Sequence, residues 1–362
     1  MKRKPSLRFC FCSGREPGVT IEDGEHNPMS LKRILVTGGA GFIGSAFVRY
    51  TLRTYPDVHV VNFDKLTYAG NLDNVKDVDP DRHTFIQGDV ADIGAVRNAL
   101  EGCGAVVNFA AETHVDRSIM GASEFIDTDV RGAHNIVEAA RELETERVLL
   151  VSTDEVYGSI AEGAFTETDP VNPRNPYSAS KAGGELMGMA FFHTFNTPVI
   201  ITRGSNTYGP YQYPEKVMPL FITNALDGEP LPLYGDGKNV RDWLYVDDHC
   251  TGIDCALRKG TPGEIYNIAG GNERENVELT YKILEVTGAS EDLIKPVKDR
   301  PGHDRRYALN ADKLKALGWR PEMDWERGVA ETAEWYANNR WWWEKIKAGD
   351  FKEYYQRQYE KR

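Results

Sequence analysis

The chain has no long apolar run and no excess of basic charge. None of its 362 residues lie in a stretch that approaches the roughly 18 uninterrupted apolar residues of a membrane span, which excludes an integral membrane protein. Lys and Arg total 43 against 55 Asp and Glu, a net charge of −12, whereas a nucleic-acid-binding protein is expected to show a basic face. An anionic ligand is still compatible with this balance, because a local cluster of cations and backbone N–H groups can hold one.

Cysteine is also scarce. The five cysteines form no C-x-x-C pair, and an odd number argues against a disulfide framework. Reduced thiols in the cytoplasm are the expectation. Cys10 and Cys12 have no second pair of ligands to complete a metal site, so no metal is predicted.

The first thirty residues differ from the rest of the chain. The basic start is not followed by an apolar segment, so it is not a secretory signal. Residues 13–30 are rich in Gly, Pro, Glu and Asp, a composition that cannot build a core. We therefore predict a disordered extension over 1–30, with the fold beginning near Met29.

From Lys32 onward, short β-branched runs alternate with longer helical patterns. The runs are almost wholly apolar, which is typical of parallel strands covered on both faces. We expect strands at 33–37, 59–63, 84–87, 105–110, 147–152 and 199–202. We expect helices between them, among others at 44–54, 93–100, 123–143 and 177–195. This alternation predicts an α/β fold with a doubly wound parallel sheet, the Rossmann fold.

The texture of the sequence changes after Arg203. Pro and Gly become dense between 209 and 237, and the regular alternation is lost. We expect a first domain at 31–203, to which 241–257 return, and a smaller second domain at 204–340. Residues 341–362 are expected to form a helical tail. Its three consecutive tryptophans, 341–343, cannot all face one side of a helix.

The strongest local motif is a glycine-rich turn at 37–44, directly after the first expected strand. Gly38 permits a tight turn, Gly41 lets the backbone approach a pyrophosphate, and Gly44 lets helix and strand pack closely. Asp64 ends the second strand, where a carboxylate bonds ribose hydroxyls and repels a 2′-phosphate. The combination predicts a site for NAD rather than NADP.

Residues at the ends of the next strands lie at the same edge of the predicted sheet. Asp89 and Val90 are expected beside the adenine, and Ala110 and Ala111 beside the pyrophosphate or ribose. Ordinary packing at a strand end explains these residue types nearly as well.

A helix is expected to begin after Asn175-Pro176, a favoured cap and first residue. Tyr177 and Lys181 then share one face of it. We expect the ammonium to lower the pKa of Tyr177, so that the phenol accepts a proton from a hydroxyl group. Following a dinucleotide motif, this pair points to hydride-transfer chemistry.

The fifth expected strand ends in Thr153, Asp154 and Glu155. Ligands bind outside the carboxyl ends of such strands, so Thr153 is placed to bond a substrate hydroxyl. Two adjacent carboxylates divide into an acid and a base if their environments separate their pKa values. Two solvated acids at a helix start are the alternative.

These motifs together resemble the extended short-chain dehydrogenase/reductases, and within them the dTDP-glucose 4,6-dehydratases. The resemblance runs from about residue 34 to residue 321 and includes the stretches 64–71, 110–118, 205–216, 231–248 and 299–307. It implies an NAD-binding first domain and a substrate-binding second domain. The implied product of dTDP-glucose is the 4-keto-6-deoxy sugar nucleotide, in deoxysugar biosynthesis such as that of rhamnose.

The resemblance also implies roles. Tyr177 takes the proton of the 4-hydroxyl while hydride leaves C4 for a retained NAD. Glu155 then removes the C5 proton, and Asp154 protonates the departing 6-hydroxyl. Finally, the hydride returns to C6. Besides Tyr177 and Lys181, NAD would contact Gly38, Gly41, Phe42, Ile43, Gly44, Asp64, Lys65, Thr67, Asp89, Val90, Ala110, Ala111, Thr128 and Thr207. The sugar nucleotide would contact His114, Thr153, Asn206, Lys216, Pro232, Tyr234, Arg241, Asn276 and His303.

Two positions depart from the family pattern, since Asp129 and Thr207 each stand where Asn is usual. Asp129 is expected to alter the polar network behind Tyr177 and Lys181, and Thr207 puts its own cofactor contact in question. The resemblance further implies a homodimer through the helices at 123–143 and 177–195. Phe191, Phe192 and Phe195 suit such an interface, or equally the core of one chain.

Two alternatives stay open at this point. A UDP-sugar 4-epimerase or UDP-glucuronate decarboxylase of the same fold would keep Tyr177, Lys181 and the glycine turn, but is not expected to carry Asp and Glu together after Thr153. A non-catalytic NAD-sensing or scaffold protein is expected to have lost some of these groups.

Overall fold

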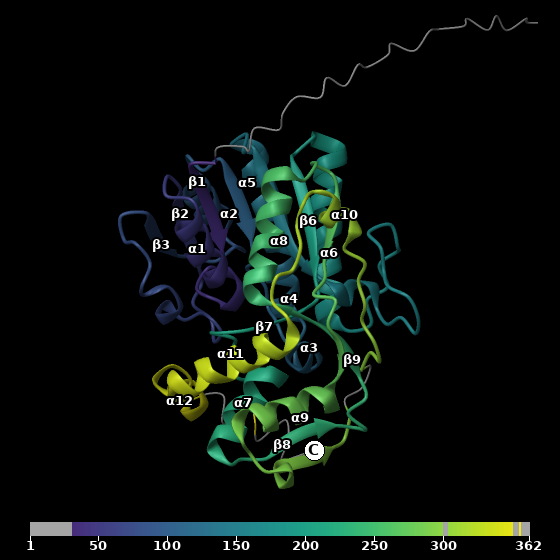
Figure 1. The fold of residues 1–362 in the computed structure, drawn as a ribbon. Coiled ribbons are helices and arrows are strands. Elements are labelled where there is room, and N and C mark those ends of the chain that lie inside the picture. Colours follow the sequence, from purple (N-terminus) through teal and green to yellow (C-terminus); the bar gives the residue numbers. More distant parts are fainter. Residues whose placement is uncertain (1–30, 300–302, 350–354, 356–362) are drawn as a thin grey trace, which may run out of the picture.

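Seven parallel strands form the central sheet of the molecule (Figure 1). The structure is a computed structural model that describes residues 31–299, 303–349 and 355, so the predicted extension, Cys10 and Cys12 lie outside the described residues. The strands follow the order β10-β6-β5-β4-β1-β2-β3. Their bounds are Arg33–Thr37 (β1), His59–Asp64 (β2), His83–Gln87 (β3), Ala105–Asn108 (β4), Arg147–Thr153 (β5), Val199–Gly204 (β6) and Ile265–Ile268 (β10).

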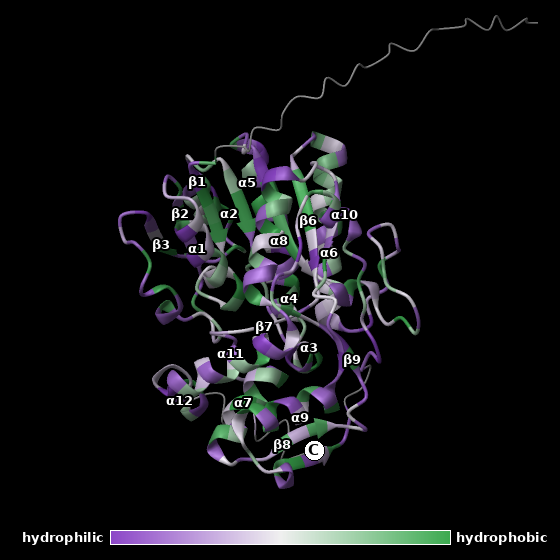
Figure 2. Cartoon of the chain, in the orientation of Figure 1, coloured by the Kyte–Doolittle hydropathy of each residue, from purple (hydrophilic) through white to green (hydrophobic). Residues whose placement is uncertain are grey.

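Helices cover both faces of this sheet, which is why its inner strands are mostly apolar, whereas the edge strand β3 is more polar (Figure 2). Ile34 and Val36 belong to a core shared with helices α1 and α8, whereas Leu35, on the opposite face, belongs to one shared with α2, α5 and α6. These helices span Phe42–Thr54 (α1), Val246–Lys259 (α8), Ile93–Leu100 (α2), Gly132–Glu142 (α5) and Pro176–Phe195 (α6). The predicted doubly wound parallel sheet is confirmed.

The helix predicted over 123–143 is not one regular α-helix. It begins as α4 (Ser123–Phe125), continues as a π-helical segment, η2 (Ile126–Arg131), and becomes α-helical again only in α5. The wider turn carries Thr128 and Asp129. Such π-helical turns are rare, are often found at functional sites and change which side chains face a neighbour.

The second part of the molecule contains two small sheets. One consists of β7 (Asn206–Tyr208), β9 (Val240–Tyr245) and β11 (Glu273–Glu275), and the other pairs β8 (Leu231–Tyr234) with β12 (Ile294–Val297). Three helices pack with them around an aromatic core: α7 (Val217–Asp227), α9 (Asn276–Thr287) and α11 (Trp325–Asn338). The shorter elements are α3 (Val115–Met120), α10 (Asp312–Ala316), η1 (Leu72–Val75), η3 (Asp154–Tyr157) and η4 (Glu291–Leu293).

The chain returns to the main sheet over a different range from the one expected. Residues 241–245 lie in β9, outside that sheet, while α8 covers the sheet and β10 extends it beside β6. The return therefore includes 265–268, which the expected range 241–257 omits. No helix in the described ranges is both long enough and apolar enough to span a bilayer.

Helix α11 ends at Asn338, and α12 then runs over Arg340–Ala348, in the first part of the expected tail; residues 350–354 and 356–362 of that tail lie outside the described residues. Trp342 and Trp343 are buried, whereas 43% of Trp341 is exposed. The three consecutive tryptophans thus face different surroundings, as the helical periodicity requires.

Candidate active site

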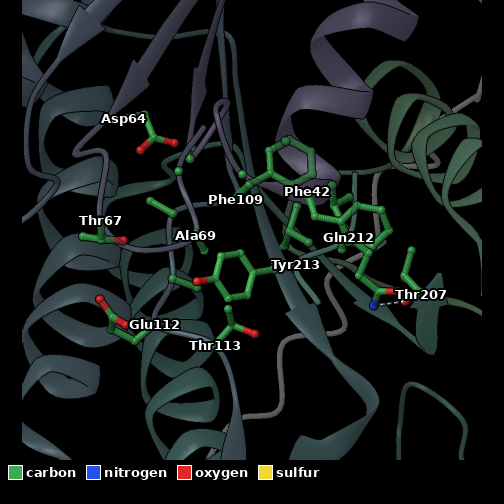
Figure 3. Close-up of a pocket in the computed structure, with 18 of the residues that line it drawn as sticks. Phe42, Asp64, Thr67, Ala69, Phe109, Glu112, Thr113, Thr207, Gln212 and Tyr213 are labelled. Carbon is green, nitrogen blue, oxygen red and sulfur yellow. Dashed lines mark hydrogen bonds between the residues drawn. The ribbon is translucent and has the colours of Figure 1, made fainter. Parts of the chain in front are cut away.

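A cavity of about 600 Å³ opens at the carboxyl ends of the strands of the main sheet. Figure 3 shows part of its wall, with Thr67, Glu112 and Tyr213 around one side and Phe42 and Gln212 at another. Every residue predicted to contact a dinucleotide lines it: Gly38, Gly41, Phe42, Ile43, Gly44, Asp64, Lys65, Thr67, Asp89, Val90, Ala110, Ala111, Thr128, Tyr177, Lys181 and Thr207.

The glycine turn leaves no room for side chains at two positions. Gly38 has a φ of 67°, and a Cβ on Gly44 would lie 2.2 Å from the carbonyl oxygen of Gly38. Helix α1 then begins at Phe42 with Gly41 as its N-cap, with no capping side chain and no acid in its first turn. Its N-terminal N–H groups are therefore available to an anion in the cavity.

Asp64 is held in place by the backbone of two neighbouring turns. Ala40 N–H donates to Asp64 Oδ2 at 2.9 Å, and Leu66 N–H donates to Oδ1 at 2.7 Å. Burial raises the pKa of this carboxyl, and the two backbone donors oppose the rise. Lys65 forms an ion pair with Asp89 at 2.7 Å on the same wall.

Tyr177 and Lys181 enter the cavity from the first turns of α6. Asn175 caps this helix, accepting from Ser178 N–H at 2.9 Å, and Pro176 is its first residue. The expected lowering of the Tyr177 pKa is wrong for the protein alone. Burial, followed by the negative charges of Glu155, Asp129 and Asp154, raises the pKa of Tyr177, while Lys181 Nζ donates to Val151 O at 2.8 Å.

The two adjacent acids differ in their surroundings. Asp154 is 3% exposed, and burial and then the charge of Glu155 raise its pKa to about 8. Thr153 Oγ1 donates to Asp154 Oδ1 at 3.1 Å, and Oδ2 is buried with no hydrogen-bond partner among the described residues. At neutral pH Asp154 is therefore a protonated carboxyl able to donate. Glu155 is less buried and accepts from Asn175 Nδ2 at 3.5 Å.

A second cavity of about 140 Å³ lies beside the first. Four residues line both of them, namely Glu155, Asn206, Glu215 and Lys216. Of the residues predicted to contact a sugar nucleotide, Thr153 lines the larger cavity only, and the second is lined by His114, Asn206, Lys216, Pro232, Tyr234, Arg241, Asn276 and His303. The structure thus brings all the predicted residues to one continuous cleft.

Two nitrogen-containing side chains of the second cavity, Arg241 and His303, are held in place by the chain around them. Arg241 donates to Asp304 O at 3.0 Å and to Val240 O at 2.7 Å, and its guanidinium lies 4.3 Å from the centre of the Tyr307 ring. His303 Nδ1 lies 2.6 Å from Asp299 Oδ1. Arg and Lys at such a site suit a diphosphate.

Several residues of the cleft were not predicted. Glu215 is buried and lines both cavities. It accepts two hydrogen bonds: Arg117 Nε donates to its Oε2 at 2.9 Å, and Tyr68 Oη donates to its Oε1 at 3.1 Å. Burial raises the pKa of Glu215, against the effect of Arg117. All three lie in the stretches that carry the family resemblance, but no spacing links segments so distant in the chain. Other unpredicted wall residues are Glu112, Gln212, Tyr213, His249, Trp342, Lys345 and Ile346.

The two departures from the family pattern have defined partners. Asp129 accepts hydrogen bonds from Ser180 Oγ at 2.5 Å and from Glu112 N–H at 3.0 Å. Burial raises its pKa to about 6, although the positive charge of Lys181 lowers it. Thr207 Oγ1 lies 2.7 Å from His249 Nδ1, and Gln212 Nε2 donates to Thr207 O (Figure 3). Burial lowers the pKa of His249 to about 3, so the ring is neutral.

The cavity fits a dinucleotide with a sugar nucleotide beside it. It has an uncapped helix N-terminus for phosphates and a fixed carboxylate for ribose hydroxyls. Some buried polar atoms of residues that line the two cavities have no hydrogen-bond partner within the described part of the chain, as expected of groups that would bind a ligand. They are Asp154 Oδ2, Asn206 Oδ1, His249 Nε2 and Asn276 Oδ1.

Comparisons with known proteins point the same way. The family model described as GDP-mannose 4,6 dehydratase matches residues 35–332. The chain is 52% identical to the low-salt glycan biosynthesis protein Agl12 of Haloferax volcanii, over 84% of this chain and 98% of that protein. It is 49% identical to a dTDP-glucose 4,6-dehydratase of Streptomyces niveus, over 88% and 96%. The crystal structure of DesIV, a dTDP-glucose 4,6-dehydratase of Streptomyces venezuelae solved with NAD bound, is similar with a TM-score of 0.85 and 52% identity, over 87% of this chain and 100% of that one.

Proposed function

The chain belongs to the GDP-mannose 4,6 dehydratase family, and on that premise we propose that it is an NAD-dependent dTDP-glucose 4,6-dehydratase. Its product is dTDP-4-keto-6-deoxyglucose, with loss of water. The names of the relatives support dTDP-glucose over other sugar nucleotides. We also propose 31–203, with the returning segments, as the NAD-binding part and 204–340 as the substrate-binding part.

One observation carries the choice of dehydratase over epimerase. Asp154 and Glu155 lie with Tyr177 on the wall of the larger cavity, and Glu155 also lines the smaller one. Oxidation at C4 needs only Tyr177, Lys181 and the cofactor. Elimination of water additionally needs a base at C5 and an acid at O6, and this pair supplies both.

The proposed steps assign one proton movement to each group. Tyr177 accepts the proton of the 4-hydroxyl. Thr153 forms a hydrogen bond with the same hydroxyl group. The C4 ketone acidifies the C5–H bond, and Glu155 takes that proton. Asp154, protonated at neutral pH because it is buried beside Glu155, donates its proton to the departing 6-hydroxyl. A proton then returns to C5.

The residues of the larger cavity would hold NAD through the N-terminus of α1, Asp64 and Lys181. When bound, NAD would supply the acceptor for the C4 hydride and the donor of the same hydride to C6, and its positively charged ring would favour the tyrosinate form of Tyr177, which burial disfavours. Arg241, Lys216 and His303 would hold the diphosphate and its neighbouring groups, with Pro232, Tyr234 and Asn276 around the nucleoside.

Two variants test the assignment of acid and base. Glu155→Gln is expected to form the 4-ketone but to exchange C5–H with solvent deuterium about 10²–10⁴-fold more slowly. Asp154→Asn is expected to slow the loss of water, and a 6-fluoro substrate, which needs less acid assistance, should restore much of that rate and little of the Glu155→Gln rate. Elimination at the wild-type rate in both variants would contradict the assignment of acid and base, whereas a wild type that does not eliminate water would favour an epimerase.

We further propose a cytoplasmic homodimer that acts in deoxysugar biosynthesis, such as that of dTDP-rhamnose. Large apolar side chains on neighbouring helices support the dimer, because Ile126 of η2 and Leu186 of α6 are 58% and 62% exposed. Phe191 instead packs in the core of its own chain. Light scattering of Leu186→Glu, which should be monomeric while the wild type is dimeric, tests this interface.

A further inference from the structure

The C-terminal helix α12 forms part of the wall of the larger cavity. Trp342, Lys345 and Ile346 line that cavity, although they lie far along the chain from the strands and turns that form the rest of it. In Figure 1, α11, drawn in yellow, lies between the central sheet and α7, and α12 follows it at the left of the view. Nothing in the steps above uses this helix.

A chain of buried hydrogen bonds connects α12 to the glycine turn. Trp342 Nε1 donates to Asn74 Oδ1 at 2.8 Å, and Asn74 Nδ2 donates to Ala40 O at 2.9 Å. Ala40 N–H in turn donates to Asp64. Trp342 is 1% exposed and Asn74 is 2% exposed, so water cannot replace a lost donor. Trp342 is therefore connected by hydrogen bonds to the glycine turn and to the Asp64 carboxylate, which would hold the dinucleotide.

A second set of contacts reaches the cavity from the same two helices. Tyr211 lines the cavity and packs edge-on against Trp342, with ring centres 5.6 Å apart. Tyr336 Oη of α11 donates to Gln212 O, and Gln212 is also a wall residue. Lys345 pairs with Asp73 of η1. Helices α11 and α12 together thus contact both η1 and residues 211–212 of the cavity wall.

We propose that α12 is a clamp on the cofactor site, in which Trp342 positions the glycine turn through Asn74 and slows the release of NAD. The proposal rests on the proposed function, because it requires that the larger cavity holds NAD. A catalytic cycle that stores a hydride and returns it needs the cofactor to stay bound between the two transfers. A helix closed over the cavity wall serves that need without touching the reacting atoms.

The consecutive tryptophans provide a matched pair of variants. Trp342→Phe keeps an aromatic ring but removes the donor to Asn74, whereas Trp341→Phe changes an exposed ring that lies over Lys76 and does not line the cavity. Each protein is loaded with radiolabelled NAD and chased with unlabelled NAD, and the release rate is measured. Trp342→Phe is expected to release NAD about five- to ten-fold faster, the effect of one lost buried hydrogen bond. Trp341→Phe is expected to match the wild type.

Equal release rates for Trp342→Phe and the wild type would overturn the clamp, as would equal acceleration by both tryptophan variants. A wild type that binds no NAD would instead contradict the proposed function. Circular dichroism and thermal melting of each variant report its folding. If Trp342→Phe does not fold, Lys345→Met provides the test of the clamp. Loss of the exposed ion pair with Asp73 should accelerate NAD release about two-fold at low salt. An unchanged rate of NAD release would overturn the proposal.

Discussion

The two cavities that meet at Glu155 are built in different ways. The larger one lies at the carboxyl ends of regularly alternating strands, and much of its wall comes from the strand ends and turns at β1, β2, β4, β5 and β6. The smaller one is assembled from short segments between His114 and Tyr307 that belong to no single sheet. The regular strand–turn–helix pattern thus places the side chains of the larger cavity, whereas contacts between segments far apart in the chain form the smaller one.

The electrostatics of the two cavities differ as well. Around Tyr177 the protein places three acids, and burial, followed by the charge of Glu155, raises the pKa values of both Asp154 and Tyr177. The smaller cavity adds Arg241 and His303 to Lys216, which lines both cavities, and its acids are Asp116, Glu155 and Glu215. The comparison predicts that variants of the first cavity change the rate of the chemical steps, and variants of the second change binding.

The largest effect is expected for Tyr177→Phe. Loss of the phenol oxygen removes the proton acceptor, so the rate of the first hydride transfer should fall about 10²–10⁴-fold while binding of dTDP is unchanged. Single-turnover absorbance of reduced cofactor measures the rate, and calorimetry measures the binding. Tyr281→Phe, at an exposed tyrosine on α9, is the control. A large loss of dTDP affinity in Tyr177→Phe would break the division between the cavities.

A smaller effect of the opposite kind is expected for Arg241→Met. Removal of a charged donor from the second cavity should raise KM for dTDP-glucose about 10–100-fold with less change in kcat. Arg305→Met is the matched control, because Arg305 pairs with Asp236 on the surface and lines neither cavity. Steady-state kinetics, with a melting curve to verify folding, decide the result. A fall in kcat at unchanged KM would show that Arg241 serves the chemical steps instead.

The acid role of Asp154 sets a limit on activity at high pH. Its pKa of about 8 means that the protonated, donating form is present below that pH and is lost above it. The rate of water loss should therefore fall about ten-fold per pH unit above pH 8. Rates of elimination between pH 6 and 10 test this. The elimination rate of Asp154→Asn should not show this decrease above pH 8. A wild-type elimination rate that stays constant through pH 9 would rule out the acid role.

The smallest effect concerns stability. The pKa of Asp129 is about 6 in the folded chain, above its ordinary value of 3.8, so the folded state holds the proton more tightly. The carboxyl therefore disfavours folding above pH 6, and the penalty fades as pH falls toward 4. Asp129→Asn should be more stable than the wild type by about 1–3 kcal/mol at pH 8 and by less at pH 5. Denaturant unfolding at both pH values measures this; an equal difference at the two would contradict it.

Prediction from the sequence succeeded where neighbouring residues decide the structure. The turn 37–44 and the strand ends carry the larger cavity, and their residue types and spacing are sufficient to find it. The π-helical turn at Asp129 was not predicted, because it depends on how η2 packs against α6. The tail was not linked to the cavity, since Trp342 and Asn74 are 268 positions apart. For the same reason the smaller cavity was outlined only through the family resemblance.

The central claim is that one hydride leaves C4 and returns to C6 of the same sugar. Incubation with dTDP-glucose deuterated at C4, followed by NMR of the product, tests it most directly. We expect a 4-keto-6-deoxy product with the deuterium at C6, even when unlabelled reduced cofactor is added in excess. A product that keeps the 6-hydroxyl and carries the deuterium at C4 would show that the protein is an epimerase and would contradict the proposed hydride transfer.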